Sequence, residues 1–116
     1  MGPIHVHAVT VNCLDAEAQA AFWGALLGVG VRGRWHEYVG LTPPSPGHPR
    51  MLFQQVPGPL PAERPTHVDL HVDDLEAATA RVLDLGGTVL ANQVHDETRW
   101  RVMADPEGNP FCLVPG

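Results

Sequence analysis

The sequence contains no lysine, and all seven of its basic residues are arginines. Against thirteen acidic residues, these leave a formal net charge of −6 at pH 7. Nucleic-acid backbones are bound chiefly by clustered basic side chains. The composition therefore disfavours nucleic acid as a partner.

The sequence also lacks long apolar runs and an export signal. No stretch of about 18 consecutive apolar residues occurs, and no basic run at the N-terminus precedes an apolar segment of signal length. The only two cysteines, Cys13 and Cys112, lie far apart in the chain. These absences predict a soluble, cytoplasmic protein without membrane contacts, in which both cysteines are reduced thiols rather than a disulfide.

What is present is one order of elements that occurs twice in 116 residues, a length typical of a single domain. Apolar periodicity and turn residues predict, in the first half, a strand over 4–12, a helix over 16–27 and three short strands over 31–38, 39–42 and 50–56. In the second half they predict a strand over 66–72, a helix over 74–85 and strands over 88–94, 99–105 and 110–114. We interpret this as an internal duplication.

The two copies are separated by a segment rich in proline. We place the first strand, helix and three-strand module at residues 1–57, a stiff connector at 58–65 and the second module at 66–116. In the second helix, Leu75, Ala78, Val82 and Leu85 repeat at steps of three and four residues. This apolar stripe is expected to pack against a sheet.

The stretch "HVDLHVDD" alternates polar and apolar residues, which places His67, Asp69 and His71 on one face of a strand. This face is either a functional site or a hydrated surface. Asp73 or Asp74, at the start of the following helix, is expected to cap it. Trp35, Tyr38 and Trp100 lie in strand runs, where they either stack on a planar ligand or pack in the core.

Four segments, "DAEAQAAFWGALLG", "FQQVPGP", "HVDLHVDDLEAATARVLDLGG" and "DPEGNPFCLV", occur in an order and spacing that resemble the vicinal oxygen chelate superfamily. The resemblance is to its glyoxalase-like branch, which includes bleomycin-resistance proteins, and it spans nearly the whole chain. It implies an α+β fold in which two βαβββ modules form a curved mixed sheet around a cavity. It also implies a homodimer, which is common in the family.

The resemblance further implies where a metal would bind. Metal-dependent members carry ligands on the first and last strands of each module, and the metal chelates adjacent oxygens of a substrate. By this resemblance His67 and Gln54 are the candidate metal ligands, although glutamate is common at the latter position. The other two positions fall on Ala8, which has no donor, and on Cys112, where glutamate is usual. His7, next to Ala8, would serve as a ligand only if a bulge shifted the strand register. If Val9 and Val11, which share strand parity with His5 and His7, face the helix, both histidines point away from the cavity.

This degraded ligand pattern favours a protein that binds, and either holds or transforms, a small organic molecule without a full metal site. His67 is then the candidate catalytic acid or base, because the unperturbed pKa of histidine, about 6.5, lies near neutrality. The expected substrate contacts are Gln54, Asp69, His71, Trp35, Trp100 and Cys112. Arg99 and Arg101 either bind an anionic substrate group or lie on a solvated edge strand.

Three alternatives remain. A lyase or isomerase of the glyoxalase or epimerase type would use a divalent metal, such as Zn, Ni, Mn or Fe, on vicinal oxygens. A bleomycin-resistance-like protein would sequester a drug, and the net negative charge suits a cationic guest. An extradiol dioxygenase needs two histidines and a carboxylate, which position 112 lacks. The sequence leaves open the substrate and whether the protein is catalytic.

Overall fold

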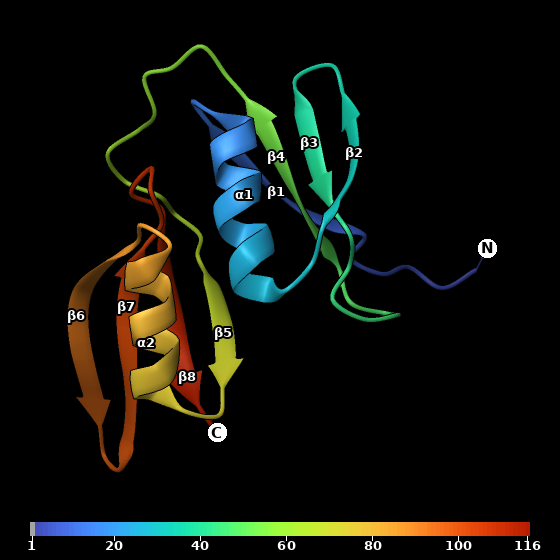
Figure 1. Ribbon diagram of the computed structural model, residues 1–116. Helices are drawn as coiled ribbons and strands as arrows, with labels where there is room; N and C mark the ends of the chain where they lie inside the picture. Colours follow the sequence, from blue (N-terminus) through green and yellow to red (C-terminus); the bar gives the residue numbers. More distant parts are fainter. Residues whose placement is uncertain (1) are drawn as a thin grey trace. The chain divides into compact units, whose positions relative to one another are not determined.

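The computed structural model describes residues 2–116 (Figure 1). The chain divides into two compact units, one ending at Leu60 and the other beginning at Pro61. Each unit consists of one helix and a four-stranded mixed sheet. The structure thus confirms the predicted α+β class with two βαβββ modules.

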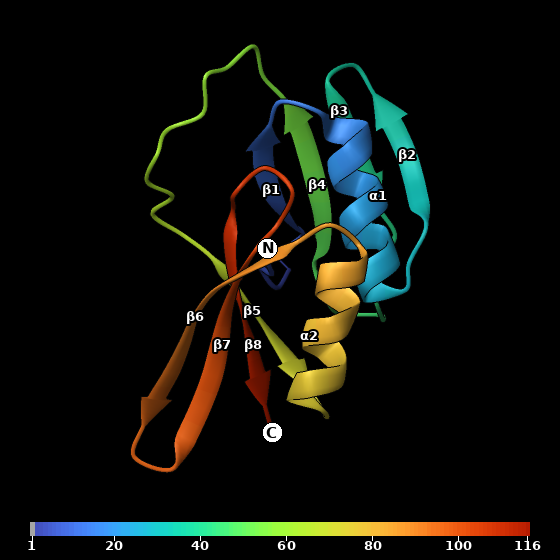
Figure 2. The ribbon, with the colours of Figure 1, turned by 60° about the vertical axis from the view of Figure 1, so that its left-hand side comes forward.

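The first unit contains β1 (Ala8–Cys13), α1 (Ala16–Leu27), β2 (Val31–Trp35), β3 (Tyr38–Leu41) and β4 (Arg50–Gln55). The strand order is β1-β4-β3-β2, with β1 parallel to β4 and the other pairs antiparallel. Helix α1 packs on one face of this sheet (Figures 1 and 2). The core between them includes Cys13, Phe22, Trp23, Leu41 and Phe53.

The second unit repeats this topology with β5 (Val68–Val72), α2 (Leu75–Asp84), β6 (Thr88–His95), β7 (Thr98–Ala104) and β8 (Pro110–Pro115). The strand order is β5-β8-β7-β6, and β5 is parallel to β8. Helix α2 contacts β8, β6 and β7. Its core includes Leu75, Val82, Met103, Phe111 and Leu113.

Both helices begin in the same way. The Asp15 carboxylate accepts a hydrogen bond from the Ala18 amide at 3.0 Å, and the Asp74 carboxylate accepts one from the Ala77 amide at 3.0 Å. These caps satisfy amides that have no partner inside the first helical turn. Of the two candidate caps of the second helix, Asp74 is the one that the structure selects.

Three strand predictions were wrong at their edges. The first strand begins at Ala8 rather than at residue 4, because its parallel partner β4 begins at Arg50 and leaves residues 4–7 outside the ladder. The strand expected over 31–38 ends at Trp35, where His36 turns with φ 53°. The strand expected from residue 66 begins at Val68.

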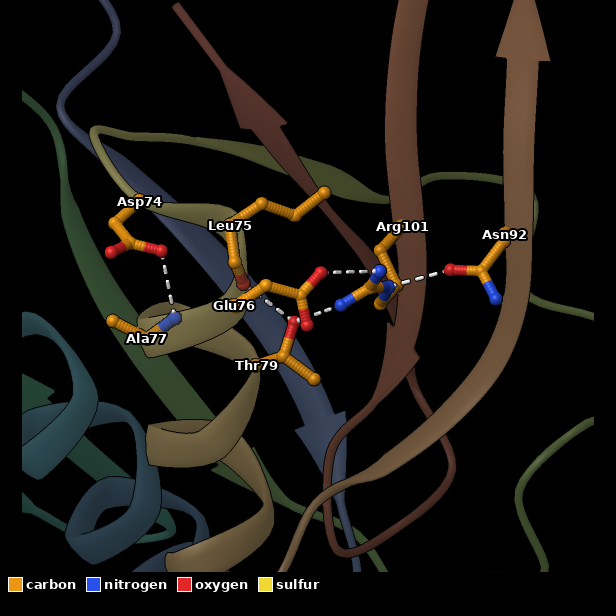
Figure 3. A network of polar contacts seen from close by, with 7 residues as sticks. All are labelled: Asp74, Leu75, Glu76, Ala77, Thr79, Asn92 and Arg101. Atoms are coloured by element: carbon orange, nitrogen blue, oxygen red, sulfur yellow. Dashed lines mark hydrogen bonds and ion pairs between the residues drawn. The ribbon is translucent and has the colours of Figure 1, made fainter.

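In the second unit, Arg101 joins the sheet to the helix (Figure 3). From β7, its guanidinium donates to Thr79 Oγ1 at 2.8 Å and to Glu76 Oε1 at 2.9 Å, both on α2. It also donates to Asn92 Oδ1 on β6 at 2.6 Å. Arg101 is therefore engaged on the helix side of its sheet, and neither sequence interpretation anticipated this role.

Each sheet has one face covered by its helix, and we call the other its open face. Within residues 2–116, no helix is long and apolar enough to cross a membrane. Cys13 and Cys112 are both buried, lie in different units and are not joined by a disulfide.

Candidate functional site

The open face of the second sheet carries the polar side chains that the alternation predicted. Along β5, Asp69 and His71 are exposed, whereas Val68, Leu70 and Val72 are half-buried. On the neighbouring β8, Phe111 and Leu113 are fully buried toward α2, so Cys112 between them points to the open face. Strand pleating thus brings residues from two distant segments to one surface.

Asp69 lies at the centre of a small cluster on this face. It is the register partner of Cys112 across the β5–β8 pair, and its Oδ1 lies 3.2 Å from Nε2 of His67. Ligand-type atoms of His67, Asp69 and Cys112 all lie within 4.8 Å of one another. Within residues 2–116 this is the one such cluster of His, Cys, Asp or Glu residues.

The cluster borders an open hollow of about 570 Å³. The hollow is lined by His67, Asp69, Gln93, Trp100, Val102, Pro110, Cys112 and Val114. Its wall is therefore largely apolar, with the His67, Asp69 and Cys112 groups gathered together. A small organic molecule is commonly bound by such a combination of apolar wall and few convergent polar groups.

The electrostatics of the cluster keep Cys112 protonated. Burial raises the pKa of the Cys112 thiol, and the Asp69 carboxylate raises it further through its charge and a hydrogen bond from the thiol. A thiol is a nucleophile or metal ligand only as a thiolate. Cys112 is therefore a neutral wall residue near pH 7 rather than an activated nucleophile.

His71 lies outside this hollow although it shares the strand face. It sits at the C-terminal end of β5, where its imidazole occupies the space that a Cβ at Gly116 would need. The backbone of Gly116 also donates to Val72 at 3.3 Å. Gly116 thus lies beside His71, which is still exposed and does not line the hollow next to His67. His71 as a substrate contact stays a prediction.

In the first unit, Gln54 and Trp35 lie on the open face of the first sheet. They line a separate hollow of about 750 Å³ together with Thr10, Arg32, Gly33, Arg34, Tyr38, Gly40, Arg50 and Leu52. Sequence analysis had not singled out Arg32 or Arg50. The parity of Arg50 with Leu52 and Gln54 in one strand was the signal that would have found it.

The duplication identifies corresponding positions in the two units. The helix caps Asp15 and Asp74 align residue 8 with 67 and residue 10 with 69. Thr10 pairs with Leu52 as Asp69 pairs with Cys112, and Asn12 pairs with Gln54 as His71 pairs with Val114. Leu52, not Gln54, is therefore the counterpart of Cys112. The first unit offers no donor side chain at Ala8 or Leu52.

Two βαβββ units, each with one sheet face covered by a helix and the other hollowed, define a protein of the vicinal oxygen chelate class. The family model of the glyoxalase-like domain matches residues 8–114. The chain belongs to this glyoxalase-like domain family. No curated protein matches it.

Three solved structures of similar fold are each less than 25% identical to this chain. A glyoxalase/bleomycin resistance protein/dioxygenase family enzyme from Burkholderia phytofirmans PsJN has TM-score 0.78 and 17% identity, covering 97% of this chain and 98% of that chain. Lactoylglutathione lyase from Agrobacterium tumefaciens has TM-score 0.71 and 17% identity, covering 100% and 96%. A bleomycin-binding protein complexed with bleomycin has TM-score 0.69 and 20% identity, covering 98% and 99%. These likenesses show the fold.

Proposed function

We propose that the protein binds a small organic molecule on the open face of the second sheet, at the hollow beside His67, without a full metal site. The observation that carries this proposal is the convergence of His67, Asp69 and Trp100 on one open hollow. The bleomycin complex of a protein with this fold supports small-molecule binding as a use of the fold.

We also propose roles for the polar groups. Asp69 contacts Nε2 of His67, which leaves Nδ1 as the nitrogen that accepts a proton from the ligand or returns one. Asp69, through its contact with Nε2, holds the orientation of the imidazole ring. Trp100 offers an aromatic face for a planar ligand. If the bound molecule is transformed, His67 is the acid or base that acts on it.

The experiment is a thermal-shift screen of the whole chain against planar metabolites, cationic antibiotics including bleomycin, and divalent ions. We expect an organic ligand to raise the melting temperature of the wild type and to lose this effect in His67→Gln. The matched control is His95→Gln, because His95 Nε2 lies 3.6 Å from Asp96 in an exposed hairpin outside the hollow. Stabilisation by divalent ions alone, or equal loss in both variants, would contradict the proposal.

A metal-dependent lyase or isomerase is the second candidate, because the donor atoms of His67, Asp69 and Cys112 converge within 4.8 Å. Nitrogen, oxygen and sulfur donors in this number suit a zinc site with an open fourth position. A metal held there would polarise adjacent oxygens of a substrate and acidify a neighbouring C–H bond. Gln54, the other metal ligand expected from the family resemblance, lies in the first unit.

The chain itself opposes tight metal binding in one respect. Cys112 must lose its proton to become a ligand, and the raised pKa of its thiol works against that loss. Zinc titration of the apoprotein by calorimetry separates the candidates. Binding of one zinc ion that strengthens with pH and disappears in His67→Gln would establish the metal site, and an unchanged weak signal in that variant would dismiss it.

A further inference from the structure

The open face of the first sheet has the opposite electrostatic character from the chain as a whole. None of the residues that line its hollow of about 750 Å³ is an aspartate or glutamate, although the chain carries a net charge of −6. Arg32, Arg34 and Arg50 all border it. A local positive field of this kind attracts an anion even when the net charge does not.

Two of these arginines, Arg32 and Arg50, have no acidic partner in any contact within the described chain. Arg34, in contrast, donates two hydrogen bonds to the carboxylate of Glu17 on α1, both at 2.9 Å. The β2–β3 register shifts between Val31 and Gly33, so Arg32 is the extra residue of a bulge. Bulges redirect side chains, and this one places Arg32 beside the same hollow as Arg50.

Arg50 borders the hollow, and its guanidinium has a donor that makes no hydrogen bond. Its Nε is buried and has no hydrogen-bond partner in the structure. Its Nη1 lies 3.9 Å from the position that a Cβ on Gly40 would occupy, so the guanidinium reaches over the glycine. An arginine in this state has donors for a carboxylate, which it binds through two parallel hydrogen bonds.

A second, smaller hollow of about 270 Å³ adjoins the same two arginines. It is lined by His5, Val6, His7, Arg32, Pro43, Gly47, His48 and Arg50. It too has no aspartate or glutamate in its wall, and it adds three imidazoles. Arg32 and Arg50 therefore lie at the border of two depressions that both lack compensating negative charge.

The other end of the larger hollow is aromatic. Trp35 and Tyr38 stack with their ring centroids 5.8 Å apart and their planes at 19°, on either side of the β2–β3 turn. Trp35 is 68% exposed, which leaves a large apolar ring surface in water. Between the aromatic and the arginine ends lie Gly33 and Gly40, which are register partners without side chains. This glycine floor lets a flat molecule approach the sheet closely.

We propose that the open face of the first sheet binds a planar aromatic carboxylate, with its ring on Trp35 and Tyr38 and its carboxylate on Arg50 and Arg32. This rests on the proposed function only in treating the open faces as binding surfaces for small molecules, because it concerns a different sheet and different residues. The guest proposed for the first sheet is anionic, whereas the net charge of the chain favours a cationic one.

The test measures binding of three probes by calorimetry at low salt. 2-Naphthoate has the ring and the charge, 2-naphthamide keeps the ring and removes the charge, and cyclohexanecarboxylate keeps the charge and removes the aromatic plane. We expect 2-naphthoate to bind at least about tenfold more tightly than either of the other two probes. A tenfold difference in the dissociation constant corresponds to the free energy of roughly one charge-assisted hydrogen bond. Equal binding of naphthoate and naphthamide would overturn the proposal.

Variants locate the site. Arg50→Gln and Trp35→Leu should each weaken 2-naphthoate binding by about tenfold, while Arg99→Gln, which removes an exposed positive charge from the second unit, should leave it nearly unchanged. Equal loss of naphthoate binding in Arg50→Gln and Arg99→Gln would show that only the net charge of the chain matters, and it would overturn the inference. His67→Gln distinguishes the two proposals. If naphthoate binding depends on His67 and not on Arg50, the inference for the first sheet fails and the proposed function at the second sheet is supported. If it depends on Arg50 and not on His67, the inference for the first sheet is supported whether or not the second sheet binds a ligand.

Discussion

The two units have the same architecture on their helix sides and different chemistry on their open faces. Asp15 and Asp74 cap the helices in the same way, and Glu17 and Glu76, each two residues later, bind an arginine from the sheet. The open faces share no such pattern: the first gathers arginines and aromatic rings, and the second gathers histidine, aspartate and cysteine. Folding requirements thus account for one face of each sheet, and ligand chemistry is the explanation we propose for the other.

The largest effect should come from the helix side, where both units depend on buried phenylalanines. Phe53 in the first unit and Phe111 in the second are both fully buried. Phe53→Ala and Phe111→Ala should each lower the free energy of unfolding by about 3–5 kcal/mol, because the lost burial is accompanied by a cavity. Urea denaturation followed by circular dichroism measures this loss.

The control for both variants is Phe→Leu at the same positions, which keeps most of the volume and should lose much less stability. If Phe111→Ala cost less than Phe111→Leu, the second core would not be packed as described. If only one of the alanine variants were strongly destabilised, the two units would not be equivalent on their helix sides.

This helix side is also the part that the sequence predicted best. The helix at 16–27 has the predicted bounds, and the stripe of the second helix does supply the buried Leu75 and Val82. Periodic apolar residues between a capping aspartate and a glycine determine a helix locally. The first strand was predicted too long because its length is set by a partner some forty residues away, which valines at positions 6, 9 and 11 do not reveal.

The open faces were predicted less completely for a related reason. The alternation over residues 67–71 revealed His67 and Asp69, but the pairing of Asp69 with Cys112 depends on the register of a parallel pair, which the sequence does not contain. Arg32 was missed because a bulge decides where it points. Arg101 was weighed as a ligand contact, whereas its parity and its helix partners place it on the other side.

The arginine to glutamate links should differ between the units despite their matching positions. Only 14% of the Arg101 side chain is exposed, against 61% for Arg34. Arg101→Gln removes hydrogen bonds to Thr79 and Asn92 as well as the ion pair, so it should lower the free energy of unfolding by about 1–3 kcal/mol. Arg34→Gln, its control, should produce no measurable change because exposed ion pairs contribute little.

The pH dependence gives this prediction a second readout. The hydrogen bond from Arg101 lowers the pKa of Glu76, so this carboxylate contributes stability above the unfolded value of about 4.5 and loses it as pH falls through the folded value. The stability difference between wild type and Arg101→Gln should therefore shrink below about pH 4.5. A difference that stays constant from pH 7 to pH 3 would mean that Arg101 acts through packing alone.

The smallest effect concerns the buried thiols, which also separate the units. In a Cys13→Ser background only Cys112 reacts with iodoacetamide, and we expect slow reaction near pH 8 because burial and Asp69 raise the pKa of its thiol. Asp69→Asn removes the negative charge, lowers that pKa and should accelerate alkylation a few-fold, about threefold to tenfold. Asp73→Asn, just beyond the same strand, controls for net charge and should leave the rate unchanged. Because the folded pKa lies above that of the unfolded chain, Cys112 should also cost stability as pH rises beyond about 8.5, and less so in Asp69→Asn. Equal alkylation rates in Asp69→Asn and Asp73→Asn would show that Asp69 does not influence the Cys112 thiol. That result would contradict the Asp69–Cys112 contact on which the second open face is built.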